Sequence, residues 1–181
     1  MIKGACWNIR GLNDRIKQGE VNLLILKHNI AFVGLLETRV RMGNRDRVTR
    51  MLPKGWSSVT NHSNSLIGRI WVLWNPNFVQ FTVIGISNQT IQGSVTIVGG
   101  RPLLSKAMAE FEHCIRKREI EDLRQTGHLF SWNNKRTESG AVAKKIDRGL
   151  GNLWWFKEFS DLKAQFLRPG ISDHSPCILP F

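Results

Sequence analysis

Two apolar segments of strand length, separated by a segment of helix length, restrict the fold of this chain more than any other feature. The first covers residues 1–9, and the second, which is continuously apolar, covers residues 30–36. Between them, Asn13 or Asp14 can cap a helix that runs to about His28. A strand, a helix and a second buried strand in this order predict a layered α/β fold.

The remainder of the chain predicts mostly short strands. Residues 56–98 contain several runs rich in Ile, Val, Thr, Phe and Trp, separated by Asn-Pro-Asn and by glycine, which is typical of consecutive antiparallel strands. Residues 129–132 predict another strand, and residues 145–150 a second short extended piece. One helix is predicted after the strands, capped by Ser105, with an apolar face made of Leu104, Met108, Phe111 and Ile115. Because no repeat or linker interrupts the pattern, we expect one domain over residues 1–181.

The charge balance indicates a polyanionic partner. Lys and Arg number 26 against 14 Asp and Glu, a formal net charge of +12. Nucleic acid is the usual partner of such a surface, whereas an acidic membrane would call for a lysine-rich amphipathic helix that the sequence lacks. The longest apolar run is too short to cross a bilayer. Three cysteines without a CxxC motif favour a reducing compartment, so we expect an intracellular location, the nucleus included, with no membrane association and no indicated protein partner.

Residues 39–50 form a strongly basic segment, which we interpret as a loop. It contains a single acidic residue, Asp46, and the five arginines Arg39, Arg41, Arg45, Arg47 and Arg50. Such a segment is either an ordinary solvated surface or a site of phosphate contact.

Polar side chains follow the predicted strands where each one ends. Asn8 ends the first strand, Glu37 ends the second, Asp147 lies in the extended piece, and Asp173 and His174 precede a last apolar run. A carboxylate that closes a buried run is costly unless it is paired or bound to a cation. A carboxylate beside an imidazole is also the pair that phosphodiester hydrolysis uses.

Each of these residues has a structural interpretation as well. Glu37 can form a salt bridge with Arg39 or Arg41, and Asn8 can close an Asx turn. Asp147 can form a surface pair with its neighbour Arg148. Taken singly, none of them identifies a site.

Five motifs in this order resemble the endonuclease/exonuclease/phosphatase superfamily. They are residues 7–13 (WNIRGLN), 35–38 (LLET), 130–134 (FSWNN), 146–148 (IDR) and 170–176 (GISDHSP). The amino-acid sequences of these motifs are most similar to those of the endonuclease domain of plant non-LTR (LINE-type) retrotransposons. The resemblance implies an α+β fold of two packed, mainly antiparallel sheets flanked by helices in a four-layer sandwich. It also implies hydrolysis of DNA phosphodiester bonds.

The resemblance gives each polar residue a role. Glu37 would ligate Mg²⁺ or Mn²⁺, with Asn8 nearby in the metal and phosphate shell. His174 would contact the scissile phosphate, oriented by Asp147. Asp173 would lie on the metal and water side.

The same resemblance implies a nucleic-acid contact surface. Ser131 and Trp132 match a segment expected to approach the nucleic acid. Arg39, Arg41 and Arg45 would follow the DNA backbone without reading its sequence.

Two parts of the family pattern are missing from the chain. The sequence has no Tyr, and it contains no Asp or Glu between Asp46 and Glu110, where the family carries a Gly-Asp-x-Asn motif. We therefore expect an internal deletion near residues 98–99, one incomplete sheet and impaired activity. The alternatives are a non-catalytic nucleic-acid-binding remnant and a phosphatase for phosphoinositides or other small phosphates; the +12 charge argues against the phosphatase.

Overall fold

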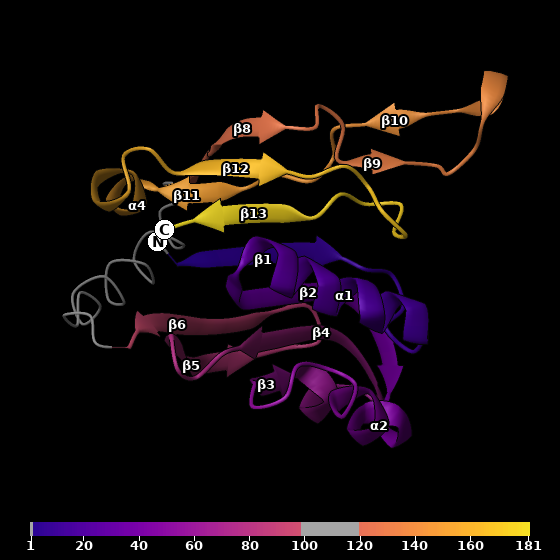
Figure 1. Ribbon diagram of the computed structural model, residues 1–181. Helices are drawn as coiled ribbons and strands as arrows, with labels where there is room; N and C mark the ends of the chain where they lie inside the picture. Colours follow the sequence, from indigo (N-terminus) through magenta and orange to yellow (C-terminus); the bar gives the residue numbers. More distant parts are fainter. Residues whose placement is uncertain (1, 99–119) are drawn as a thin grey trace.

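A computed structural model describes residues 2–98 and 120–181. Its main element is a seven-stranded sheet, whose strands can be followed in Figure 1. The strands of this sheet lie in the order β3 (Ser57–Thr60), β4 (Ile67–Trp74), β2 (Ile30–Arg41), β1 (Lys3–Asn8), β13 (Cys177–Pro180), β12 (Lys163–Phe166) and β8 (Arg124–Gly127). The β1–β2 and β12–β8 pairs are parallel, and the other neighbours in the sheet are antiparallel.

Shorter strand pairs and helices surround this sheet. The pairs are antiparallel: β5 (Val79–Ile86) with β6 (Ile91–Ile97), β7 (Ile120–Asp122) with β11 (Leu150–Asn152), and β9 (Trp132–Asn133) with β10 (Ala143–Lys144). The helices are α1 (Arg15–His28), α2 (Arg45–Thr49) and α4 (Leu153–Glu158), with 3-10 turns η1 (Met42–Asn44), η2 (Asn61–Asn64) and η3 (Glu138–Gly140). The predicted α+β class with mainly antiparallel pairing is confirmed. None of the described helices has both the length and the apolar character needed to cross a membrane.

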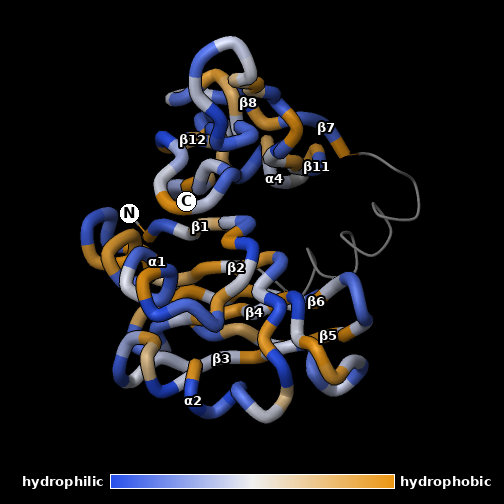
Figure 2. The backbone as a smooth tube through the Cα atoms, turned by 90° about the vertical axis from the view of Figure 1, so that its right-hand side faces the viewer, coloured by the Kyte–Doolittle hydropathy of each residue, from blue (hydrophilic) through white to orange (hydrophobic). Residues whose placement is uncertain are grey.

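The first strand, helix and strand form as the sequence predicts. The Asp14 side chain accepts a hydrogen bond from the Ile16 amide at 2.8 Å and so caps α1, which ends at His28. Buried Val21 and Ile25 on α1 belong to the same core cluster as residues of β1 and β2. In Figure 2 the strands β2 and β4 are largely hydrophobic, while the outer turns are hydrophilic. Helix α1 is therefore fixed to the sheet by apolar burial, which contributes about 1.5–3 kcal/mol for each large side chain.

Three sequence predictions need correction. The basic segment 39–50 is not a loop, because β2 continues to Arg41 and is followed by η1 and α2. The strand predicted at residues 129–132 is reduced to Trp132–Asn133, and residues 145–149 form no strand before β11 begins at Leu150. The arginine-rich segment has no apolar periodicity that would indicate a helix or a strand. The bounds of a short strand depend on which residues of a neighbouring strand it pairs with, and the sequence alone does not give that pairing. The helix predicted around Leu104 to Ile115 lies outside the described residues.

The β5–β6 hairpin pairs with no other strand in the part of the chain that the structure describes. A buried polar side chain, Asn61, connects it to the large sheet by hydrogen bonds. Its Oδ1 accepts hydrogen bonds from the amides of Arg69 and Ile70 on β4, at 2.9 and 3.0 Å. Its Nδ2 donates to the carbonyls of Ser87 and Asn88 in the hairpin turn, at 3.3 and 3.0 Å. Asn61 thus uses its full hydrogen-bonding capacity to hold the hairpin in place.

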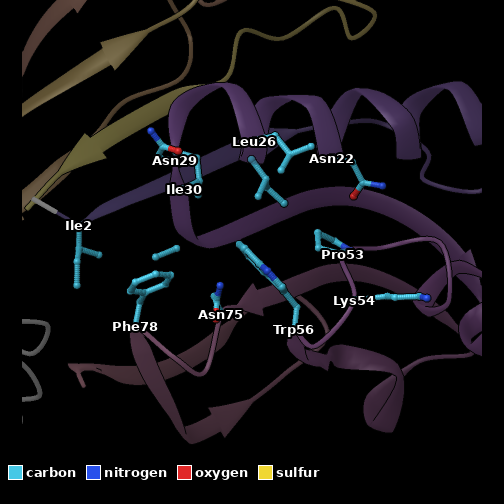
Figure 3. A pocket seen from close by; sticks show the side chains of 12 residues that line it. Ile2, Asn22, Leu26, Asn29, Ile30, Pro53, Lys54, Trp56, Asn75 and Phe78 are labelled. Carbon is cyan, nitrogen blue, oxygen red and sulfur yellow. The ribbon is translucent and has the colours of Figure 1, made fainter. Parts of the chain in front are cut away.

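A groove of about 820 Å³ lies beside α1 and the beginnings of β1 and β2 (Figure 3). Ile2 and Ile30 mark that end of the two strands, and Trp56 and Phe78 form much of the apolar wall. None of the predicted site residues lines this groove. The groove is therefore separate from the site that the sequence predicts.

The two described cysteines face each other across the β1–β13 pair. Cys6 and Cys177 are in register and carry free thiols. Burial raises the pKa of Cys6 to about 11 and that of Cys177 to about 12, with a smaller contribution in the same direction from Asp147. Both thiols stay protonated near neutral pH and are poor nucleophiles there.

Replacing Asn61 should loosen the hairpin. Asn61→Ala leaves two amides and two carbonyls without their partner, so we expect a loss of about 2–4 kcal/mol in the free energy of unfolding, measured by urea denaturation. Asn88→Ala is the control, because the Asn88 side chain is exposed. Equal stability of the two variants would contradict the role given to Asn61.

Candidate active site

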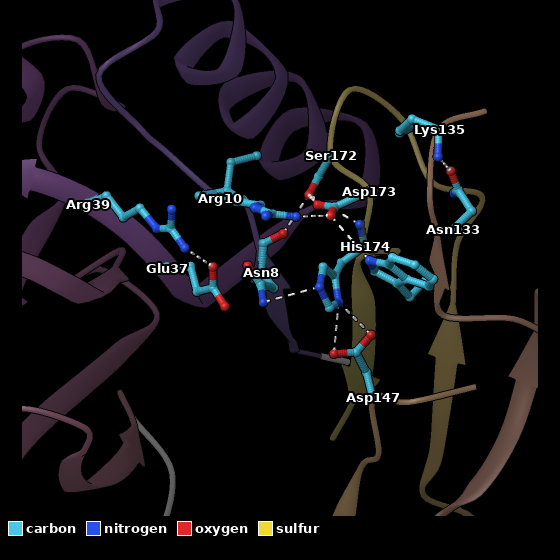
Figure 4. A network of polar contacts seen from close by, with 12 residues as sticks. Asn8, Arg10, Glu37, Arg39, Asn133, Lys135, Asp147, Ser172, Asp173 and His174 are labelled. Carbon is cyan, nitrogen blue, oxygen red and sulfur yellow. Dashed lines mark hydrogen bonds and ion pairs between the residues drawn. The ribbon is translucent and has the colours of Figure 1, made fainter. Parts of the chain in front are cut away.

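Most of the predicted site residues gather at the end of β1, beside the irregular part of β2, and just before β13 begins (Figure 4). Because β1 and β2 are parallel, Asn8 and Glu37 come at the same edge of the sheet. Because β13 runs antiparallel to β1, the residues that precede β13 lie beside Asn8. The Ser172 hydroxyl donates to the Asn8 carbonyl at 2.6 Å, which fixes this junction. Motifs from the two ends of the chain therefore meet in one place.

His174 is held between Asp147 and Asn8. Its Nδ1 lies 2.8 Å from Asp147 Oδ2 and 3.1 Å from Oδ1, and its Nε2 lies 3.4 Å from Asn8 Nδ2. The imidazole is only 12% exposed. A carboxylate accepts and cannot donate, so Nδ1 carries a proton and Nε2 is the nitrogen turned toward the site. The alternative pairing of Asp147 with Arg148 does not occur, because Arg148 pairs with Asp122.

The main chain around His174 is fixed from the neighbouring hairpin. Trp132 forms a bridge with His174, the Ser175 amide donates to the Ser131 carbonyl at 2.7 Å, and the Asn133 amide donates to the Asp173 carbonyl at 2.9 Å. The residues immediately before and after His174 are therefore both hydrogen-bonded to the hairpin, which fixes the backbone that carries the imidazole.

Ser131 supports the site from inside the protein. Its side chain is fully buried, and the approach of the Ser131–Trp132 segment to nucleic acid stays a prediction. Its hydroxyl accepts hydrogen bonds from the amides of Ile146 and Asp147, at 3.1 and 2.8 Å. Ser131 thereby positions the carboxylate that holds His174.

Asp173 is engaged by two donors on one carboxylate oxygen. Oδ2 accepts from the Arg10 guanidinium and, at 3.1 Å, from the Trp132 indole nitrogen. Burial alone would raise the pKa of Asp173, but these hydrogen bonds and the nearby positive charges outweigh it and place the pKa below its usual value. The carboxylate is ionised at neutral pH and turned toward Arg10 and Trp132. Its role on the metal and water side stays a prediction.

Sequence reasoning missed Arg10 as a site residue. Arg10 has a φ of +49° and is followed by Gly11 with a φ of +101°. This turn comes directly after β1 and carries the Arg10 side chain to the edge where Asn8 ends the strand. The sequence could have indicated this role, because Arg10 follows the predicted site residue Asn8 by two positions.

Glu37 lies in an irregular part of β2. Glu37 and Arg39 have φ values of +51° and +50°, and the pairing of β2 with β4 shifts register between Leu36 and Val40. Thr38 between them is buried, and its hydroxyl donates to the Gly68 carbonyl at 2.9 Å. The bulge turns Glu37 and Arg39 to the same side, where Arg39 Nη2 lies 3.0 Å from Glu37 Oε2. The predicted salt bridge of Glu37 therefore exists, with Arg39.

The oxygen atoms at this edge suit a divalent metal. Asn8 Oδ1 is buried and has no hydrogen-bond partner, and the Glu37 carboxylate is 42% exposed. Mg²⁺ prefers oxygen ligands and accepts one or two carboxylates together with waters and substrate phosphates. Glu37 and Asn8 thus fit such an ion. Among the described residues no cluster of three or more His, Cys, Asp or Glu side chains is arranged to hold a metal, so water and substrate would complete the coordination.

The other predicted DNA-binding arginines lie away from this cluster. Arg41 is exposed at the end of β2. Arg45 begins α2 and contacts the neighbouring Asp46 at 3.3 Å. The structure thus brings Arg39 to the site and leaves Arg41 and Arg45 on the adjoining surface.

Comparison with known proteins identifies the fold. No protein-family model and no curated protein sequence matches the chain. Among solved structures, the chain matches D. rerio TDP2 complexed with single strand DNA product, with 11% identity over 98% of this chain and 97% of that chain and a TM-score of 0.61. It matches the 3′ phosphatase NExo from Neisseria bound to product DNA hairpin, with 14% identity over 100% and 99% of the two chains and a TM-score of 0.63. It also matches an endonuclease/exonuclease/phosphatase family protein from Leptotrichia buccalis, with 11% identity over 100% and 99% and a TM-score of 0.55.

The lowered pKa of Asp173 predicts a loss of stability in acid. The folded state binds fewer protons than the unfolded state, so the contribution of the ionised carboxylate is complete above pH 5 and is lost progressively as the pH falls below about 4, through the folded-state pKa. We expect Asp173→Asn to cost about 1–3 kcal/mol in the free energy of unfolding at pH 7 and progressively less as the pH falls below about 4. Thermal denaturation across this range, with the exposed Asp161→Asn as control, tests the expectation. A difference that does not change with pH would contradict it.

Proposed function

Because the chain has the fold of endonuclease/exonuclease/phosphatase proteins, we propose that it is a metal-dependent phosphodiesterase domain that acts on DNA. We further propose that it derives from the endonuclease of a plant LINE-type retrotransposon and that it turns over slowly. The five ordered sequence motifs support this origin. The arrangement of Asp147, His174 and Asn8 supports the chemistry.

The hydrogen-bonded series Asp147–His174–Asn8 is the observation that carries the proposal. Asp147 accepts from Nδ1–H and so keeps Nε2 turned toward the site. When the ring is doubly protonated, Nε2–H can donate to an oxygen of the scissile phosphate. The Asn8 amide, 3.4 Å from Nε2, lies where it can contact the same phosphate. A divalent ion held by Glu37 would polarise the phosphate and offset its developing negative charge.

DNA is favoured over a small phosphate ester by the charge of the chain. The formal net charge is +12, and exposed Arg10 and Arg39 flank the site. Arg41 and Arg45 continue the positive surface away from the site. Such a surface matches an extended polyanion and supplies affinity without sequence preference.

Slow turnover follows from the state of the site carboxylates. Each is already engaged: Asp147 by His174, Asp173 by Arg10, and Glu37 by Arg39. The described residues offer no carboxylate in this network beyond these three to accept a proton from an attacking water. The β5–β6 hairpin, which pairs with no other described strand and is followed in the sequence by residues 98–99, is consistent with an internal deletion that removed such a group. Loss of one member of a catalytic unit typically costs several orders of magnitude in rate.

Plasmid nicking tests the proposal. The protein should relax supercoiled plasmid slowly with Mg²⁺ or Mn²⁺ and not with EDTA, and His174→Ala should lower the rate by about 10²-fold or more while DNA binding persists. His28→Ala, at the distant end of α1, is the control and should nick like the parent protein. Equal nicking by His174→Ala would contradict the proposed site. DNA binding without nicking by any variant would instead support a non-catalytic remnant.

A further inference from the structure

The pairing of Arg39 with Glu37 is built into the backbone. Both residues adopt left-handed conformations, which cost a non-glycine residue of order 1–3 kcal/mol each. The bulge is held by hydrogen bonds from the amides of Gly11 and Leu12 to the carbonyls of Glu37 and Thr38, at 2.8 and 2.7 Å. The Asn13 side chain holds the Arg39 carbonyl at 2.9 Å. The chain therefore fixes a positive side chain directly beside the carboxylate best placed to bind a metal.

This pair is easily separated. The Glu37 and Arg39 side chains are 42% and 52% exposed, and they share a single contact of 3.0 Å. Exposed ion pairs of this kind are worth about 0–1 kcal/mol. A divalent cation with oxygen ligands competes readily with an interaction of that size.

The neighbouring pair of Arg10 and Asp173 is different. Asp173 is 12% exposed and accepts a second hydrogen bond, from Trp132. Separating Arg10 would leave a nearly buried carboxylate with an unpaired charge, which is costly. Of the two described arginines that contact site carboxylates, Arg39 is therefore the one that can move.

We propose that Arg39 is a displaceable counter-ion of Glu37, which opposes metal binding in the free protein and moves to a DNA phosphate when substrate binds. This inference rests on the proposed function, because it requires Glu37 to bind a metal. The planar guanidinium suits a phosphate as well as it suits a carboxylate, so one side chain can serve both partners. Occupation of Arg39 by DNA then frees Glu37, and metal and DNA strengthen each other's binding reciprocally.

The test measures Mn²⁺ binding directly, from the electron paramagnetic resonance signal of free Mn²⁺. The parent protein is compared with Arg39→Gln, with Arg41→Gln as a matched control that removes the same charge from the same strand, and with Glu37→Gln. Without DNA, Arg39→Gln should bind Mn²⁺ about three- to fivefold more tightly than the parent, the range that an exposed ion pair allows. Arg41→Gln should change the affinity much less, because exposed charges farther from the metal are screened. With a phosphorothioate oligonucleotide present, the difference between the parent and Arg39→Gln should disappear.

The possible failures are distinguishable. If the parent binds Mn²⁺ and Glu37→Gln weakens that binding, but Arg39→Gln is no tighter than the parent, only this inference is overturned. An equal gain in Arg41→Gln also overturns it, because the effect would then be one of net charge. A difference that persists with the oligonucleotide overturns the transfer to phosphate. If the parent binds no Mn²⁺, both the inference and the metal-dependent function are overturned.

Discussion

The position of β1 between β2 and β13 is the constraint on which the rest of the structure depends. Parallel pairing on one edge brings Asn8 and Glu37 to the same end of the sheet, and antiparallel pairing on the other edge brings His174 beside them. Asn8 and His174 are thereby in contact although 166 positions separate them in the chain. The pairing is secured by apolar burial under α1, because Ala5, Trp7 and Val33 belong to one core cluster. A buried scaffold of this kind holds polar groups in fixed geometry at its edge, as a catalytic site requires.

The electrostatics of the site follow from pairing in a strongly basic chain. With a formal net charge of +12, each carboxylate of the network has a positive or proton-donating neighbour. The pairs differ in strength because they differ in exposure. The nearly buried Asp173 is fixed to Arg10 and Trp132, whereas the partly exposed Glu37 and the exposed Arg39 can separate. Burial thus divides the site into a permanent part around Asp173 and His174 and an exchangeable part around Glu37.

The sequence predicts the features that depend on a local pattern of residues. It does not predict those that depend on contacts between residues far apart in the chain. The cap at Asp14, the end of α1 at His28 and the buried strands β1 and β2 follow from spacing and apolar content. The bulge at residues 37–39 contains no glycine, so nothing in the sequence signals its left-handed residues. Arg10 and Asp173 are 163 positions apart, and their pairing follows only once β1 and β13 are known to be neighbours. For the same reason the burial of Ser131 could not be predicted from the sequence. A serine that precedes a tryptophan is equally compatible with an exposed position in contact with a ligand.

The proposed function depends on Asp147, which sets the proton on His174 so that Nε2 faces the phosphate. Long-range ¹H–¹⁵N NMR correlation of the imidazole measures this directly, because it distinguishes the two ring nitrogens. We predict that neutral His174 carries its proton on Nδ1, that Asp147→Asn disturbs this preference, and that a DNA oligonucleotide shifts the Nε2 signal most. A proton on Nε2 in the neutral ring, with no response to Asp147→Asn or to DNA, would contradict it.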